Sequence, residues 1–177
     1  PLVKRASICI IHGYGEQSDD YLEVRASPTQ IADYFARNRF VVHMIDMRGF
    51  GYSGGHRIQD CLSELFYDIE ILMRCCETNL PAFLMASGLG AMLLLNLLIE
   101  NPNLPINGVI TLTPTLTFPK EDRGFGSEAV RWLCREYLGE FLVNSHVNPT
   151  GLTKRADVLK TSIDKGLNYQ YIKYSCQ

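Results

Sequence analysis

Several features that mark particular protein classes are missing from this sequence. Charge of one sign does not predominate, because 17 lysines and arginines stand against 19 aspartates and glutamates among 177 residues, so no basic surface for nucleic acid is indicated. The longest apolar run, residues 91–99, is interrupted by Asn96 and is far shorter than the roughly 20 residues of a membrane span. No signal-peptide pattern opens the chain, and we therefore expect a cytoplasmic protein.

The cysteines form no metal-binding pattern. There is no C-x-x-C pair and no cluster of histidines, and the adjacent Cys75 and Cys76 suit neither a zinc site nor an easy mutual disulfide. We expect all six cysteines to be free thiols in a reducing compartment. The sequence predicts no metal site and no cofactor.

Strand patterns alternate with helix patterns up to residue 114. Apolar residues make up 46% of the chain and charged residues 20%, which suits one packed core. The predicted strands are short apolar runs at 7–11, 40–45, 82–86 and 108–113. The predicted helices between them lie at 27–35, 60–79 and 89–101. This order predicts an α/β fold with a mostly parallel sheet and flanking helices.

The pattern changes after Pro114. Helices are predicted at about 128–142 and 155–166, and no further buried strand is recognisable before Gln177. We therefore expect an α/β part, residues 1–114, followed by a helical segment, residues 115–177.

Glycine-containing motifs follow the first three predicted strands. They are His12-Gly13-Tyr14-Gly15-Glu16, Asp46-Met47-Arg48-Gly49-Phe50-Gly51-Tyr52-Ser53-Gly54 and Ala86-Ser87-Gly88-Leu89-Gly90. In this order, each at the C-terminal end of a strand, the motifs resemble those of the α/β-hydrolase fold, in its monoacylglycerol-lipase or serine aminopeptidase S33 branch. The resemblance implies that residues 1–114 are the N-terminal part of an incomplete hydrolase core, and that residues 115–177 form a helical cap-like segment.

The third motif occupies the place of the family's nucleophile elbow, which has the pattern G-x-S-x-G. Alignment on the preceding strand and on Gly90 puts Gly88 at the nucleophile position of this pattern. Ala86 then stands where the pattern has its first glycine. Glycine adopts the strained backbone of such a turn at little cost, so the turn can persist without a nucleophile. Ser87 lies one residue early, and we expect its hydroxyl to cap the helix that begins near Leu89. A repositioned Ser87 nucleophile remains the alternative.

The resemblance also assigns roles around the first motif. It implies an oxyanion hole made by the backbone N–H groups of Tyr14 and Leu89, which can bind a carbonyl or carboxylate even where no attacking oxygen is present. His12 and Gly13 belong to the same loop, and we expect His12 to shape that loop rather than to transfer protons.

The second motif is expected to be structural. By the resemblance, Asp46 and Arg48 tie its glycine-rich loop under the sheet. A phosphate-binding loop is disfavoured, because the glycines do not open a helix and no Walker lysine follows them.

A catalytic acid and base are not recognisable after the elbow. The candidates there are Asp122, His146, Asp157 and Asp164, and none of them lies at the end of a predicted strand. A triad of Ser87, Asp122 and His146 is therefore disfavoured. The resemblance places the acid and the histidine on strands that follow the cap, so a serine hydrolase would require them to lie beyond this chain.

The sequence leaves two kinds of function open. The preferred one is a non-catalytic α/β-hydrolase-like protein, acting as a structural or binding component of a larger assembly. The alternative is a serine hydrolase of the monoacylglycerol-lipase type whose remaining triad members lie beyond this chain, or a pseudoenzyme that binds a lipid or acyl ligand without turnover.

The family's strand order gives an expectation about partners. It places strand 40–45 at one edge of the sheet, then strands 7–11 and 82–86, and strand 108–113 at the other, apolar edge. Natural proteins normally cover, charge or interrupt such edges. We expect a protein partner, or a missing C-terminal portion, to cover this edge.

Overall fold

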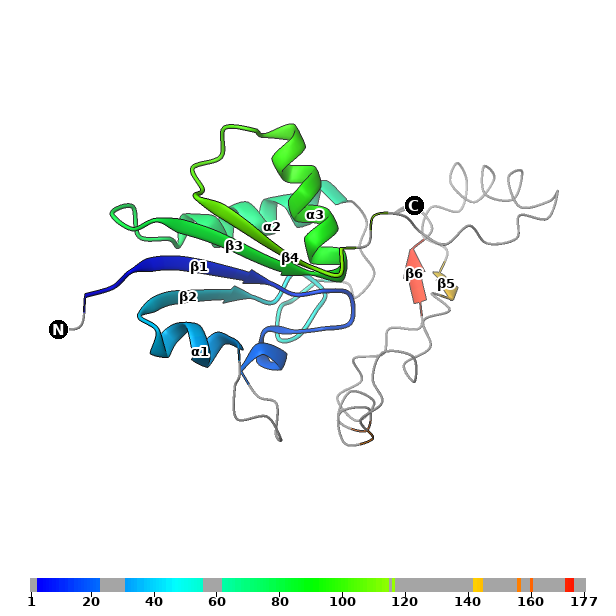
Figure 1. Ribbon diagram of the computed structural model, residues 1–177. Coiled ribbons are helices and arrows are strands. Elements are labelled where there is room, and N and C mark those ends of the chain that lie inside the picture. The colour runs from blue at the N-terminus through cyan, green and yellow to red at the C-terminus, as the bar shows by residue number, and fades with distance from the viewer. Residues whose placement is uncertain are drawn as a thin grey trace. The chain divides into compact units, whose positions relative to one another are not determined.

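The computed structural model describes residues 3–22, 31–55, 62–114, 116, 142–144, 156, 160 and 171–173. Contacts divide the chain into two compact units, one formed by Pro1–Gly55 and Ser63–Leu116 and the other by His56–Leu62 and Thr117–Gln177. The first unit carries a four-stranded sheet with its helices (Figure 1).

All strands of this sheet run parallel. Their bounds are β1 Ala6–Ile11, β2 Phe40–Ile45, β3 Ala82–Ser87 and β4 Gly108–Leu112. The strand order is β2-β1-β3-β4, so β1 and β3 lie in the middle. The predicted α/β class and the predicted strand order are both confirmed.

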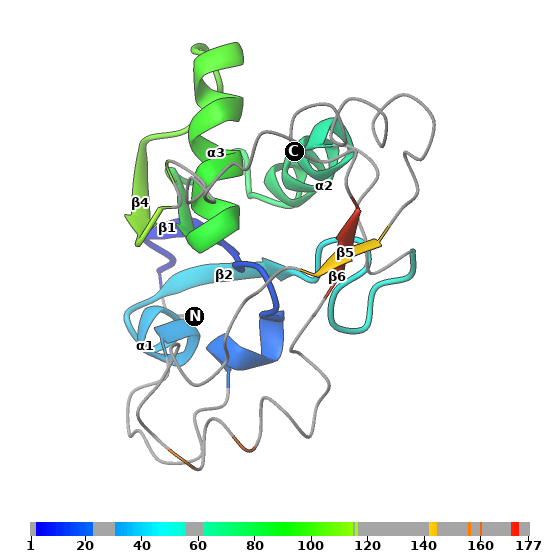
Figure 2. The same cartoon turned by 90° about the vertical axis from the view of Figure 1, so that its right-hand side faces the viewer.

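Helices cover both faces of the sheet (Figure 1, Figure 2). Helix α1, Ile31–Arg37, lies on one face, and helices α2, Leu62–Arg74, and α3, Gly88–Glu100, lie on the other. The buried apolar residues of α2 lie three or four positions apart, as the sequence pattern predicted, and are Leu65, Ile69 and Leu72. A short 3-10 turn, η1 Ser18–Tyr21, follows β1.

Strand β1 is buried along its whole length, because strands flank it on both sides and helices cover both of its faces. Ile8 and Ile10 pack with Met85 and with Ala32 of α1 on one face. On the other face the Cys9 thiol donates to the backbone oxygen of Leu72 in α2, at 3.7 Å. The apolar run that predicted this strand is therefore explained by burial on both faces.

Two helices differ in their bounds from the prediction. The expected N-cap of the first, Ser27, lies outside the described residues, and α1 is described from Ile31 onward. Helix α2 ends at Arg74 instead of continuing to residue 79, because the amides of Cys75 and Cys76 donate to carbonyls three residues back and so tighten the last turn. No helix within the described ranges is long and apolar enough to cross a membrane.

The second unit contains a strand pair that the sequence pattern did not predict. Strands β5, Leu142–Asn144, and β6, Tyr171–Lys173, run antiparallel, with Leu142 opposite Lys173. Leu142 thus begins a strand, although it was predicted as the end of a helix whose other residues lie outside the described ranges. Three residues are too few to show the alternation by which a strand is recognised. The helical cap-like character of residues 115–177 stays a prediction.

Helix α3 begins very close to the C-terminal end of β1. A Cβ atom at Gly90 would lie against the backbone oxygen of His12 and 2.9 Å from Cγ2 of Ile11, closer than real Cβ contacts come. Only glycine therefore allows the first turn of α3 to pack against the end of this strand. The last glycine of the third motif is thus required by packing.

This close approach predicts the effect of a single methyl group. Alanine normally stabilises a helix by about 1 kcal/mol relative to glycine. Gly90→Ala should instead lower the free energy of unfolding by about 1–3 kcal/mol, as overpacked cores do. Urea denaturation followed by circular dichroism measures this difference. Gly54→Ala is the matched control, because nothing lies within 4 Å of a Cβ atom at Gly54. Equal midpoints for the two variants would contradict the packing argument.

Candidate functional site

The turn from β3 into α3 has the shape expected of a nucleophile elbow. Its tip, Gly88, has a φ of +47°, in the left-handed region that costs a residue with a side chain about 1–3 kcal/mol. A Cβ atom at this position would meet only the Cα atom of Gly13, at 3.8 Å. There is space for a side chain at the tip of the turn, and the sequence supplies none.

Ser87, one residue before the tip, does not cap α3 with its side chain. It is the N-cap residue by backbone conformation, but its hydroxyl makes no cap hydrogen bond, and the predicted capping role is wrong. The hydroxyl instead donates to Oε2 of Glu16, at 2.7 Å, and lies 2.7 Å from the hydroxyl oxygen of Tyr21. A charged carboxylate is a stronger partner for this hydroxyl than a helix amide, and it comes from 71 residues away.

Glu16 joins the loop after β1 to the end of β3. The same oxygen, Oε2, also accepts hydrogen bonds from the backbone N–H of Gly13, at 2.6 Å, and from the hydroxyl of Tyr21, at 2.7 Å. Burial, followed by the nearby Glu16 charge, raises the pKa of Tyr21, so its hydroxyl stays protonated and can donate. We refer to Glu16, Tyr21 and Ser87 as the elbow triangle.

Two members of the elbow triangle were missed by the sequence reasoning. Glu16 closes the first motif, but nothing in the motif indicates that its side chain reaches β3. Tyr21 lies in η1, outside every motif, and carries no sequence signal.

The residues predicted for the oxyanion hole lie on the two segments that meet at the elbow. Tyr14 follows Gly13, and its ring packs edge-on against Phe50 with 5.9 Å between ring centroids. Leu89 follows Gly88 as the second residue of α3, where backbone N–H groups have no partner within the helix. Gly13 and Gly88 are near neighbours, since a Cβ atom added at Gly88 would lie 3.8 Å from the Cα atom of Gly13. An oxyanion-binding role for the two amides stays a prediction.

His12 holds the loop through both ring nitrogens. Nδ1 donates to the backbone oxygen of Gly13, at 2.8 Å, and Nε2 accepts from the backbone N–H of Met47, at 3.0 Å. The ring is buried and packs edge-on against Phe50. Burial lowers the pKa of His12, which favours the neutral ring that this pair of hydrogen bonds requires. His12 thus joins the first motif to the second.

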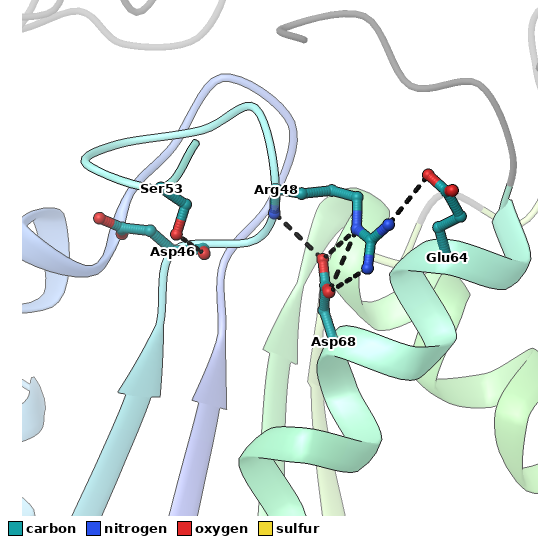
Figure 3. A network of polar contacts seen from close by, with 5 residues as sticks. All are labelled: Asp46, Arg48, Ser53, Glu64 and Asp68. Atoms are coloured by element: carbon teal, nitrogen blue, oxygen red, sulfur yellow. Dashed lines mark hydrogen bonds and ion pairs between the residues drawn. The ribbon is translucent and has the colours of Figure 1, made fainter. Parts of the chain in front are cut away.

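Asp46 organises the glycine-rich loop. Its carboxylate accepts backbone hydrogen bonds from Ser18, at 2.7 Å, and Tyr52, at 2.9 Å, while its backbone oxygen accepts the Ser53 hydroxyl (Figure 3). Burial opposes the charged form, but these donors outweigh it and lower the pKa of Asp46. At Gly51, φ is +52° and a Cβ atom would collide with this carboxylate.

Arg48 ties the same loop to α2. Figure 3 shows its side chain between Asp68 and Glu64. Its Nη2 atom donates to Asp68 at 2.8 Å and its Nε atom at 3.0 Å, while Nη1 lies 3.0 Å from Glu64. The backbone N–H of Arg48 also donates to Asp68. Asp46 and Arg48 are therefore engaged in holding the loop, and Arg48 does so through α2.

The other sequence candidates are not placed at this site. Asp122, His146, Asp157 and Asp164 lie outside the described residues. Within the described ranges the histidines are His12 and His43, and neither is hydrogen-bonded to Ser87; nor does any group of three or more metal-ligating side chains occur there.

Comparison with known proteins gives both a family and a fold. A model of the serine aminopeptidase S33 family matches residues 3–173. An uncharacterized abhydrolase domain-containing protein of Dictyostelium discoideum is 29% identical over 112 residues, which are 63% of this chain and 11% of that protein.

Among solved structures, monoacylglycerol lipases are similar to this chain. The Paleococcus ferrophilus enzyme has a TM-score of 0.77 at 21% identity, and the match covers 98% of this chain and 64% of that one. A soluble variant of monoglyceride lipase from Saccharomyces cerevisiae, in complex with a substrate analog, has a TM-score of 0.71 at 16% identity, covering 97% and 57%. These likenesses show the α/β-hydrolase fold, and the chain spans about three fifths of the length of these enzymes.

The buried neutral ring of His12 predicts a pH dependence of stability. The unfolded chain takes up a proton at this histidine near its ordinary pKa of 6.5, whereas the folded protein takes it up only at lower pH. The free energy of unfolding should therefore fall as the pH decreases below 6.5. Denaturant titrations at about pH 7.5 and pH 5.5 measure this loss.

His12→Gln is the comparison variant, because glutamine does not titrate and keeps an acceptor for the Met47 amide. It should lose less stability between the two pH values than the unaltered protein. The lowered pKa of Asp46 acts below the ordinary value of 3.8 and does not contribute in this window. Equal losses in both proteins would contradict the assigned role of His12.

Proposed function

The chain belongs to the serine aminopeptidase S33 family of the α/β-hydrolase fold, and on that basis we propose that it is a non-catalytic member acting as a structural or binding component of a larger assembly. One observation carries this proposal. At the position where the family's elbow presents a serine, the tip of the turn is Gly88, with a left-handed backbone and space for a side chain.

The missing side chain removes the first chemical step of ester hydrolysis. Acyl transfer through an elbow requires an oxygen that attacks the carbonyl carbon and a base that takes its proton. Gly88 has no side chain and therefore no hydroxyl oxygen that could attack. The His12 imidazole lies next to Gly13, and both of its nitrogens are already engaged in hydrogen bonds with the backbone.

Binding of a ligand does not depend on a side-chain oxygen at position 88. Backbone N–H groups of the kind predicted at Tyr14 and Leu89 can bind a carbonyl or carboxylate whatever the neighbouring side chain is. The solved relatives include a lipase in complex with a substrate analog, and a carboxyl esterase from Bacillus coagulans in complex with glycerol. An acyl or lipid ligand is therefore the small-molecule class that we propose for this protein.

A second candidate function uses Ser87 as the nucleophile. Its hydroxyl donates to Glu16 at 2.7 Å, and a nucleophile bonded to a carboxylate that is itself oriented by other groups has the form of an activated pair. We place this candidate second, because Oε2 of Glu16 would have to take the proton and is already bonded to Gly13 and Tyr21. This is the serine hydrolase alternative in a form in which Glu16 of this chain would be the base.

A serine-directed probe separates the two functions. The purified chain should form no covalent adduct with a fluorophosphonate, and it should hydrolyse p-nitrophenyl esters no faster than Ser87→Ala. Gly88→Ser should remain inactive, because a serine without its base is a weak nucleophile. Intact-protein mass spectrometry and ester assays measure both.

The result that would overturn the proposal is stoichiometric labelling of the unaltered chain. Labelling lost in Ser87→Ala would assign hydrolysis to this serine. The comparison of Glu16→Gln with Tyr21→Phe then identifies the base, since both variants disturb the elbow triangle. Only the first removes a basic group, because the raised pKa of Tyr21 keeps its hydroxyl protonated.

We further propose that another β-strand pairs along the outer edge of β4. In the described part of the sheet β4 pairs with β3 alone, and its side chains Val109, Ile110 and Leu112 are 36–40% exposed. An apolar edge strand without charge or proline is normally covered in natural proteins. This strand would come from a partner protein or from elsewhere in the full polypeptide.

Hydrogen exchange tests the edge proposal. With β4 uncovered, the amides of residues 108–113 that point away from β3 should exchange fast, and the 177-residue chain should associate in solution. Exchange read by NMR, together with light scattering, measures both properties. A soluble monomer with strong protection at every amide of this segment would contradict the proposal.

A further inference from the structure

Two cysteines that are distant in the sequence have their sulfur atoms in contact. Cys9 lies in the middle of β1, and Cys76 lies two residues after the end of α2. Their Sγ atoms are 3.3 Å apart, although 67 positions separate the residues. Neither residue belongs to the elbow or to the glycine-rich loop, so the pair is independent of the proposed function.

The two thiols differ in their access to solvent. Cys9 is completely buried, donates to the backbone oxygen of Leu72, and burial raises its pKa. Cys76 is half-buried and is the member of the pair that a small oxidant can reach. The neighbouring Cys75 is exposed, but its thiol donates to the backbone oxygen of Ile71, one turn back in α2.

We propose that Cys9 and Cys76 are a site of reversible thiol oxidation, with a peroxide as the oxidant. The Cys76 thiolate attacks one peroxide oxygen and becomes a sulfenic acid, while the other oxygen leaves as hydroxide or alkoxide and is protonated. The Cys9 sulfur then displaces the hydroxyl group from Cys76, and the Cys9 proton leaves with it as water. One peroxide bond is reduced, two thiols are oxidised to one disulfide, and a dithiol reductant reverses the change.

Little movement is needed to close this bond. A disulfide has its sulfur atoms about 2.05 Å apart, so the two atoms must approach by roughly 1.2 Å. Cys76 lies in the irregular segment between α2 and β3, which can adjust more easily than β1. The sulfenic acid formed at Cys76 would already touch its partner, which favours the disulfide over further oxidation.

The disulfide would fasten the C-terminal end of α2 to the central strand. Helix α2 also carries Glu64 and Asp68, which hold Arg48 and with it the glycine-rich loop. Oxidation therefore acts on the helix that anchors the glycine-rich loop, and the resistance of the protein to urea should rise.

Peptide mapping of the full chain tests the proposal. Trypsin places Cys9 in residues 6–25 and Cys76 in residues 75–120. The reduced chain is treated with hydrogen peroxide, unreacted thiols are alkylated, and the digest is examined by mass spectrometry. The unaltered chain and Cys75→Ser should both yield the two peptides joined by a disulfide, within a monomer and cleavable by dithiothreitol.

Cys76→Ser should lose this linked peptide completely, and its fold is checked by circular dichroism because Cys76 is only half-buried. Cys9→Ala is the second variant, and it should carry Cys76 to the sulfinic acid under the same treatment. A linked peptide that persists in Cys76→Ser would assign the reaction to Cys75 and overturn the proposal. The proposal would also be overturned if no linked peptide formed in the unaltered chain, whether Cys76 was oxidised or remained a thiol.

Discussion

The close approach of α3 to the end of β1 is the constraint on which the site depends. Gly90 allows the first turn of the helix to lie against Ile11 and the backbone oxygen of His12. That contact fixes where β3 must end, and the left-handed residue Gly88 then makes the sharp turn between strand and helix. The elbow is thus held by backbone packing, and no part of this packing requires a hydroxyl at the tip.

The polar contacts around the elbow also serve to hold segments of the chain together. Glu16 binds the Gly13 amide and the Ser87 hydroxyl, so it fastens the loop after β1 to the end of β3. The loop after β2 is fastened separately, through Asp46 and through Arg48 bound to α2. Neither set of contacts passes through Gly88. A turn held in this way can keep its geometry whatever residue occupies the tip, because the stabilising contacts are made by other residues.

Most of the sheet was predictable from the sequence, and most of the elbow triangle was not. Buried parallel strands appear as continuous apolar runs, and the family that the loop motifs resemble then implied the arrangement of all four strands. The assignment of Gly88 followed from the strand before it and from Gly90. The capping role of Ser87 failed because a hydroxyl binds whichever partner the tertiary structure offers, and Glu16 is 71 positions away. Local patterns carry no information about such a partner. The contact of Cys9 with Cys76 could not be predicted for the same reason, because 67 positions separate the two residues.

Ion pairs and a thiol contact connect α2 to its neighbours at different points along its length. The helix is bound to the glycine-rich loop by ion pairs near its start and in its middle, and beyond its end Cys76 meets the central strand. Partly exposed ion pairs contribute little stability individually, so the loop depends on how firmly α2 itself lies on the sheet. Apolar packing of Leu65, Ile69 and Leu72 provides that firmness at all times. A bond between Cys9 and Cys76 would add to it only under oxidation, at a point just beyond the end of α2.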